Sequence, residues 1–107
     1  MQKGTGLMEI NVTREGATVF VKPEEEIHFD NYKEVEARIV EEINAGAKEI
    51  VLDLTNVNTL YSMTLGMFNK IAASISEKGG KFALTNINND IRKVLKATRL
   101  DKIIAIR

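Results

Sequence analysis

The side chains that could carry metal or acid-base chemistry are few in this chain of 107 residues. There is no cysteine, and the one histidine, His28, lies beside Glu24, Glu25 and Glu26. Thiolate zinc sites and cysteine nucleophiles are therefore excluded, and one histidine among glutamates is typical of a solvated loop. A single histidine remote in sequence from any activated serine offers no candidate Ser-His-Asp triad. We expect a protein without catalytic residues, metal or cofactor, and we assign no role to the segment from Glu24 to His28.

The segment Gly79-Gly80-Lys81 contains the residue types of a phosphate-binding loop. It follows an expected helix and precedes an expected strand, which reverses the strand-loop-helix order of such loops, and the spaced first glycine is missing. We interpret it as the end of a helix.

Hydroxyl groups gather in the stretch Tyr61-Ser62-Met63-Thr64, directly before an amphipathic segment. Ser62 is a good helix N-cap, and Thr64 fits the first turn. Tyr61 and Met63 at an exposed helix start suit a partner interface, where aromatic and methionine side chains are enriched. The alternative is that these two side chains close the core.

The charges indicate which partners the chain attracts. Fifteen basic and fifteen acidic residues cancel. No broad positive field is left to collect nucleic acid or anionic lipid, so we expect no direct nucleic-acid binding. A local basic cluster lies on or after the last expected helix and is interpreted as a solvated face, with a site for an acidic partner as the alternative. Its members are Arg92, Lys93, Lys96, Arg99 and Lys102.

The composition is that of one folded domain. The chain is 44% hydrophobic and 28% charged, close to ordinary globular values. We expect a single domain over residues 1–107, with residues 1–6 as a flexible N-terminal segment. No apolar run approaches the roughly 18 residues of a membrane span, and the first residues lack the apolar stretch of a signal peptide. We therefore expect a cytoplasmic protein without membrane insertion.

The elements that must position these residues begin with a hairpin and a helix. Alternating apolar residues predict two strands before Pro23, and spacings of three and four predict a helix that begins at the N-cap Asp30 and ends at Gly46. Glu34 and Arg38 are expected to pair on its outer face. The apolar positions are Met8, Ile10, Val12, Ala17, Val19 and Val21 in the strands, and Tyr32, Val35, Ile39 and Ile43 in the helix.

Helices and strands then alternate to the end of the chain. The run Ile50–Leu54 predicts a central strand covered on both faces. A second helix ends at Gly79-Gly80, a strand covers Phe82–Leu84, a third helix is capped by Asn88-Asn89-Asp90, and a last strand covers Ile103–Ile106. The inward positions of the two helices are Leu65, Phe68, Ile71, Ala72 and Ile75, then Ile91, Val94, Leu95 and Thr98. The expected core includes Leu52, Leu54, Phe68, Ile71 and Leu95.

Two stretches carry a resemblance to a known family. The first runs from the strand Val51-Leu52-Asp53-Leu54 through Leu60-Tyr61-Ser62-Met63-Thr64-Leu65-Gly66, and the second runs from Ile91 to Ile103 with its turn Thr98-Arg99-Leu100-Asp101. Both resemble the STAS domain of bacterial anti-sigma factor antagonists. The resemblance implies an α/β fold of order β-β-α-β-α-β-α-β, a mixed sheet of four to five strands with three main helices packed on it. The loop from Lys22 to Phe29 departs from the family pattern and is longer.

The resemblance also implies a function. Such antagonists bind an anti-sigma factor that is also a serine kinase, and they release a sigma factor so that transcription is regulated. Met63 falls on the phosphoacceptor position, which leaves Ser62 and Thr64 as possible relocated acceptors. A helix N-terminus stabilises a phosphate, and the added charge would oppose docking of the partner. The expected partner-binding residues are Tyr61, Ser62, Met63 and Thr64.

Two other functions fit the same residues. The chain could be a STAS interaction subunit of a larger signalling or transport assembly that is not phosphorylated. It could also be a small-ligand carrier or an enzyme on the same fold, since a fold alone does not fix a function. The oligomeric state is left open by the sequence.

Overall fold

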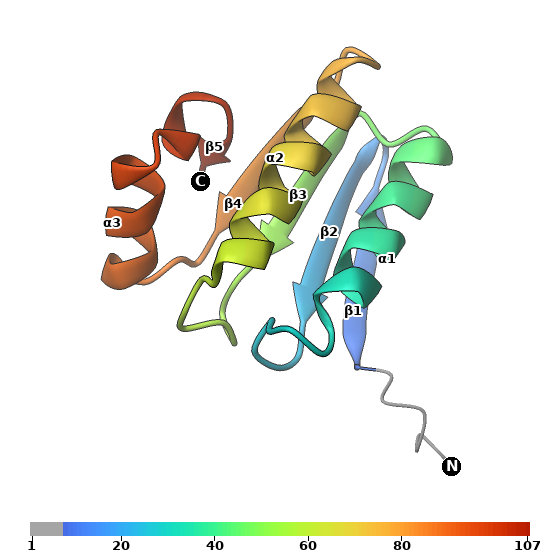
Figure 1. Ribbon diagram of the computed structural model, residues 1–107. Coiled ribbons are helices and arrows are strands. Elements are labelled where there is room, and N and C mark those ends of the chain that lie inside the picture. The colour runs from blue at the N-terminus through green and yellow to red at the C-terminus, as the bar shows by residue number, and fades with distance from the viewer. Residues whose placement is uncertain (1–7) are drawn as a thin grey trace.

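A computed structural model describes residues 8–107 of the chain. The N-terminal segment 1–6, expected to be flexible, lies outside the described residues. The five strands are β1 (Ile10–Glu15), β2 (Thr18–Pro23), β3 (Glu49–Asp53), β4 (Lys81–Thr85) and β5 (Ala105–Ile106). The helices are α1 (Tyr32–Asn44), α2 (Ser62–Ser76) and α3 (Asn89–Ala97), followed by the short 3₁₀ helix η1 (Leu100–Lys102). This order confirms the predicted alternation (Figure 1).

The five strands form one mixed sheet in the order β1-β2-β3-β4-β5. β1 and β2 are antiparallel, with Glu15 opposite Thr18, so a two-residue turn joins them. Gly16 in that turn has φ +63°, a left-handed conformation that glycine adopts without a steric penalty. The remaining pairs are parallel, with β3 at the centre and β5 at the edge, as the sequence predicts.

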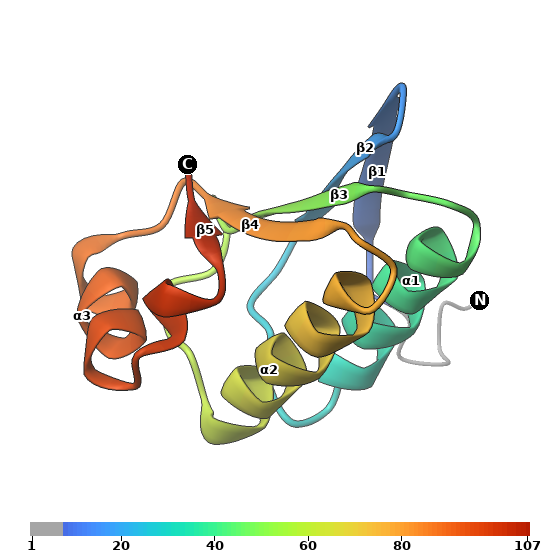
Figure 2. The ribbon, with the colours of Figure 1, turned by 90° about the horizontal axis from the view of Figure 1, so that it is seen from above.

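All three α-helices lie on one side of the sheet (Figure 2). Their inward side chains form one core with alternate residues of the strands, and the five expected core residues are all buried there: Leu52, Leu54, Phe68, Ile71 and Leu95. The prediction of the core is therefore confirmed.

The central strand β3, which the sequence predicts to be covered on both faces, is buried on both, although the helices lie on one side only. Val51 is buried on the helix-free face, where the strand register aligns it with Phe20 and Ala83. Because its neighbours on the adjacent strands cover it, Val51 is buried without a second layer of helices.

The helix ends differ from the sequence expectations in two places. Asn31, not Asp30, occupies the N-cap of α1, and its side chain bonds the preceding loop: Oδ1 accepts from the His28 amide at 2.9 Å, and Nδ2 donates to the Glu26 carbonyl at 2.9 Å. Thr98 is exposed rather than inward. It follows the last turn of α3, where its hydroxyl donates to the Val94 carbonyl at 2.8 Å.

The last strand is shorter than predicted, since β5 covers only Ala105–Ile106. Leu100–Lys102 form η1, and Ile103 is exposed while Ile104 is buried. The apolar run of the sequence therefore spans an irregular segment as well as the strand.

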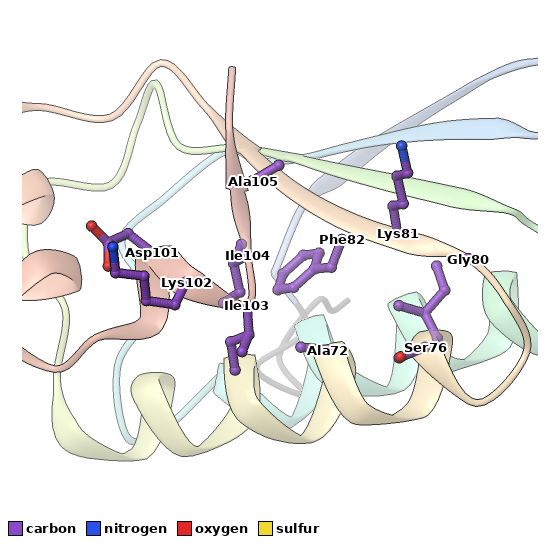
Figure 3. A pocket seen from close by; sticks show the side chains of 11 residues that line it. Ala72, Ser76, Gly80, Lys81, Phe82, Asp101, Lys102, Ile103, Ile104 and Ala105 are labelled. Carbon is purple, nitrogen blue, oxygen red and sulfur yellow. The ribbon is translucent and has the colours of Figure 1, made fainter.

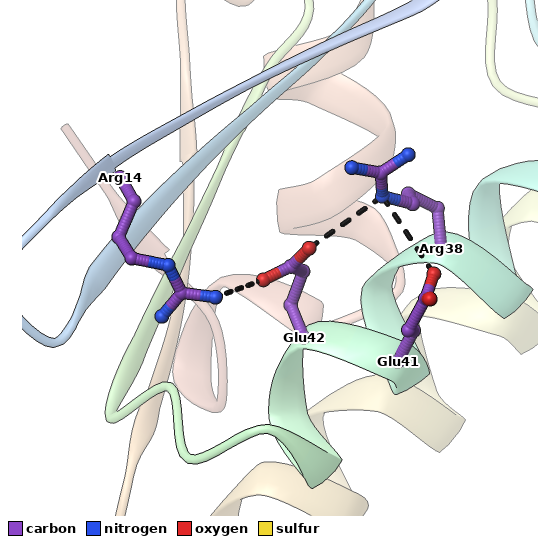
Figure 4. Close-up of polar contacts among 4 residues, drawn as sticks. All are labelled: Arg14, Arg38, Glu41 and Glu42. Carbon is purple, nitrogen blue, oxygen red and sulfur yellow. Dashed lines mark hydrogen bonds and ion pairs between the residues drawn. The ribbon is translucent and has the colours of Figure 1, made fainter.

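The expected ion pair of Glu34 with Arg38 is replaced by a different arrangement (Figure 4). Arg38 pairs with Glu42 at 3.5 Å and with Glu41 at 3.8 Å, and Arg14 of β1 also pairs with Glu42. The Glu34 carboxylate instead accepts a hydrogen bond from the Met8 amide at 2.7 Å. Arg14 and Arg38 thus neutralise the buried Glu42 carboxylate. The pair with Arg14 joins the β1–β2 hairpin to the end of α1.

Candidate functional site at the start of helix α2

The carboxyl ends of β2, β3 and β4 lie at one edge of the sheet, and the loops that follow them meet there (Figure 1). The β3–α2 loop, residues 54–61, leads directly into the predicted partner-binding residues. Leu54 and Val57 are buried and anchor the loop to the core, and the Val57 amide donates to the Leu54 carbonyl at 3.0 Å. The burial of Leu54 and Val57 therefore fixes the conformation of the loop from which α2 starts.

A polar network joins this loop to its neighbours on both sides. The Glu26 carboxylate accepts hydrogen bonds from the Asn58 amide and side chain at 2.8 to 3.0 Å. On the other side, the Asn58 carbonyl accepts from Asn88 Nδ2 at 3.1 Å, while Asn88 Oδ1 caps α3 by accepting from the Ile91 amide. Glu26, left without a role by the sequence, thus holds the β3–α2 loop in place.

Glu24, from the same segment as Glu26, makes a second contact with the β3–α2 loop. Its carboxylate accepts from Asn56 Nδ2 at 3.1 Å, and the same Nδ2 lies 3.3 Å from the Pro23 carbonyl oxygen. The polar residues that follow each strand, such as Asn56, Asn58 and Asn88, are the sequence signal that could have revealed this network, because the carboxyl ends of parallel strands converge.

Asp53, the last residue of β3, fixes the beginning of the same loop. Its Oδ1 accepts from the Thr55 amide at 3.0 Å, from the Thr55 hydroxyl at 2.6 Å and from Asn86 Nδ2 at 3.0 Å. Burial alone would raise the pKa of Asp53. The hydrogen bonds from Thr55 and Asn86, together with the charge of Lys22, outweigh burial and lower that pKa below its ordinary 3.8.

This pKa shift predicts a contribution of Asp53 to acid stability. A carboxyl group with a lowered pKa in the folded state stabilises the fold above the unfolded-state pKa, near 3.8, and that stabilisation is lost as the pH falls through the lower folded value. We expect the melting temperature of the wild type to fall more steeply below pH 4 than that of Asp53→Asn, as measured by circular dichroism. Parallel acid profiles would contradict the prediction.

The four predicted site residues differ in their accessibility. Tyr61 is 45% exposed, Ser62 is exposed, and Met63 is half-buried. Thr64 is fully buried, and its hydroxyl has no hydrogen-bond partner among residues 8–107. The structure thus brings Tyr61, Ser62 and Met63 to the surface at the helix start and removes Thr64 from it.

The N-cap of α2 is Tyr61 and not Ser62, which the sequence suggested. Tyr61 occupies the N-cap position with extended backbone (φ −97°, ψ 165°), and in the described part of the chain its side chain makes no capping hydrogen bond to the helix. Ser62 is the first helical residue rather than the N-cap. The amides of Thr64 and Leu65 donate to the Tyr61 carbonyl at 3.0 and 3.1 Å, so the turn closes through the backbone.

The unpaired Thr64 hydroxyl predicts that Thr64→Val will not weaken the fold. A buried hydroxyl without a partner has lost its water bonds, at a cost of about 1 to 3 kcal/mol, and valine has nearly the same shape without that penalty. We expect the free energy of unfolding in urea to stay equal or to rise by about 1 kcal/mol. A loss above about 1 kcal/mol would show that the hydroxyl is bonded in solution. Thr98→Val, which loses a hydroxyl that donates to Val94, is the matched control.

Within residues 8–107, no three His, Cys, Asp or Glu side chains are grouped so that they could hold a metal ion. In the same range, none of the helices has the length and apolar character needed to cross a membrane.

The chain is similar to known proteins over most of its length. The family model described as "STAS domain" matches residues 9–107. A Thermotoga maritima protein, named as a candidate anti-sigma factor antagonist, is 35% identical over 89 residues, which cover 82% of this chain and 79% of that protein. Its homologue from Thermotoga neapolitana is 34% identical over 89 residues, with the same two coverages of 82% and 79%.

Solved structures share the fold of this chain. The crystal structure of the candidate antagonist from Thermotoga maritima superimposes with a TM-score of 0.85 at 32% identity and covers 91% of this chain and 84% of that one. The unphosphorylated anti-sigma factor antagonist SpoIIAA superimposes with a TM-score of 0.78, covering 92% of this chain and 88% of its own. At 18% identity this second likeness bears on the fold alone. The chain belongs to the STAS domain family, and its relatives in that family are named as anti-sigma factor antagonists.

Proposed function

We propose that this protein is a cytoplasmic anti-sigma factor antagonist that acts by binding and not by catalysis. Its partner is an anti-sigma factor of the serine-kinase type, and binding frees a sigma factor and so regulates transcription. The observation that carries the proposal is the start of α2, where Tyr61 and Met63 reach the surface on a loop fixed at both sides. The names of the relatives support the class of partner.

The chemistry of this surface suits protein recognition. Tyrosine and methionine give large contact areas, and both are enriched where proteins meet. The loop under them is tied to Glu26 and Asn88 by hydrogen bonds of 2.8 to 3.1 Å. A fixed loop loses little conformational entropy on binding, which favours affinity.

The regulation of this surface is proposed to differ from a phosphorylation switch. Met63 stands where the family resemblance places the phosphoacceptor, and its thioether has no hydroxyl to phosphorylate. Thr64 is buried and therefore closed to a kinase. Of the two possible relocated acceptors, Ser62 and Thr64, Ser62 is the exposed one. We propose that Ser62 is a first-turn residue of α2 without a regulatory role.

Incubation with the cognate kinase and ATP, followed by mass spectrometry, tests this regulation. We expect no phosphate on the wild type, because position 63 lacks a hydroxyl, and stoichiometric phosphate on Met63→Ser, which restores one. Phosphate on Ser62 of the wild type would show that the acceptor has moved by one residue and that the switch survives. Ser62→Ala confirms the assignment of any modified residue.

A further inference from the structure

Helix α2 contains a glycine, Gly66, that the fold of the described residues does not require. Gly66 lies inside the helix, and its φ is not positive. A β-carbon added at this position would meet no other part of residues 8–107 within 4 Å. Alanine would therefore fit at position 66 without a clash and without backbone strain.

The other four glycines of residues 8–107 have a clear reason within the fold. Three of them adopt a positive φ, which other residues rarely adopt: Gly16, Gly46 and Gly79. At Gly80 a β-carbon would lie 2.5 Å from the Lys48 carbonyl oxygen and 2.7 Å from the Ile75 side chain, so no larger residue fits. Gly66 differs from all four, because neither its backbone nor its surroundings exclude a side chain.

Glycine at an exposed helical position weakens the fold. It loses more conformational freedom on folding than alanine does, which lowers the folding equilibrium constant by about two- to fivefold. Gly66 is exposed, so no buried contact offsets this loss. A glycine that weakens the free protein is expected where the backbone of another molecule must approach closely.

Gly66 continues the proposed interface along α2. Residues three and four positions apart are neighbours on a helix surface, so Gly66 lies beside Met63 and Ser62. The next residues along this outer side, Asn69 and Lys70, are exposed as well. All three α-helices lie on one side of the sheet, and the outer side of α2 faces away from it (Figure 2). A partner that covers Met63 therefore also reaches Gly66.

We propose that a helix of the anti-sigma factor crosses α2 at Gly66, with its backbone against the Gly66 α-carbon. The inference rests on the proposed function. Backbone groups inside a helix bond to one another, so α2 offers a partner no strand pairing and is suited to helix packing. Packed helices lie about 8 to 10 Å apart, depending on the side chains at the contact. The absence of a side chain at position 66 permits the shorter distance, which lets Met63 reach more deeply into the partner.

Gly66→Ala tests the proposal because its effects on folding and on binding have opposite signs. We expect the melting temperature to rise by about 2 to 8 °C, since alanine favours the helix. In calorimetric titration with the anti-sigma factor, the dissociation constant should rise at least about tenfold. Gly66→Leu should fold, because the position is exposed, and should bind more weakly still. A substitution that merely disturbed the fold would lower stability and affinity together.

Ser76→Ala is the matched control. Ser76 is an exposed residue at the end of the same helix, on the flank that faces the C-terminal segment (Figure 3). It lies ten positions after Gly66, or about 15 Å along the helix axis. Alanine also favours the helix at this position, but the dissociation constant should stay unchanged.

The outcomes distinguish this inference from the proposed function. Equal dissociation constants for the wild type and Gly66→Ala would overturn the inference and leave the proposed function standing. Equal losses for the alanine and leucine variants would assign the effect to helix flexibility and also overturn it. A wild type that binds no anti-sigma factor would contradict the proposed function, and this inference with it. A wild-type dimer in sedimentation velocity that Gly66→Leu dissociates would assign Gly66 to a second copy and overturn the assigned occupant.

Discussion

Replacing Phe68 with alanine is expected to lower the free energy of unfolding by about 3 to 5 kcal/mol. Phe68 is fully buried in the middle of α2, and its ring meets that of Phe82 edge to face, with centroids 5.8 Å apart and an interplanar angle of 75°. Truncation removes both the buried area and this aromatic contact and leaves a cavity between α2 and β4. Since small domains have about 5 to 15 kcal/mol of stability, the loss is a large fraction of the total.

Urea denaturation measures this loss, with Phe29→Ala as the matched control. Phe29 is 75% exposed, so its truncation should change stability by less than about 0.5 kcal/mol. If Phe68→Ala cost less than about 1 kcal/mol, α2 would not pack on the sheet through this residue.

Met63→Glu is expected to weaken binding of the anti-sigma factor by several kcal/mol while leaving the fold intact. At the proposed interface the new carboxylate must lose its water without gaining a partner, which is the origin of the binding penalty. In the free protein the same charge lies in the first turn of α2, where the helix dipole favours it by about 0.3 to 1 kcal/mol. Lost binding could then not be attributed to unfolding.

Thermal melting and calorimetric titration of the same samples separate the two effects. Met63→Leu is the control, because it keeps an apolar side chain of similar volume and should bind within about 1.5 kcal/mol of the wild type. An unchanged dissociation constant for Met63→Glu would show that the partner docks elsewhere. The exposed basic face of α3, with Arg92, Lys93 and Lys96, would then be the next surface to test.

The helices, the central strand and the core could be predicted from the sequence, because apolar spacing and glycine caps are strong, local signals. Apolar spacing located α1, α2 and α3, and the continuous run at Ile50 located the central strand. Gly46, with φ +106°, ends α1 as its position predicted. Periodicity and glycine caps act within a few residues, so one chain is enough to read them.

What the sequence did not reveal depends on contacts between distant segments. Glu26 and Asn58 are separated by 32 positions, and nothing local to either residue indicates that they bond. The burial of Thr64 likewise follows from the way α2 sits on the sheet, although its neighbours Ser62 and Met63 remain accessible. Asn31 displaced Asp30 as the N-cap because its side chain bonds the loop before it, which the helix pattern alone does not encode.

Release of the sigma factor is the most direct measurement of the proposed function. A preformed complex of the anti-sigma factor with its sigma factor is mixed with increasing amounts of this protein and analysed by size-exclusion chromatography. The proposal predicts that free sigma factor appears in proportion to added wild-type protein without prior treatment by a phosphatase, and that Met63→Glu releases far less. A complex that stays intact at excess wild-type protein, with the fold confirmed by circular dichroism, would contradict it.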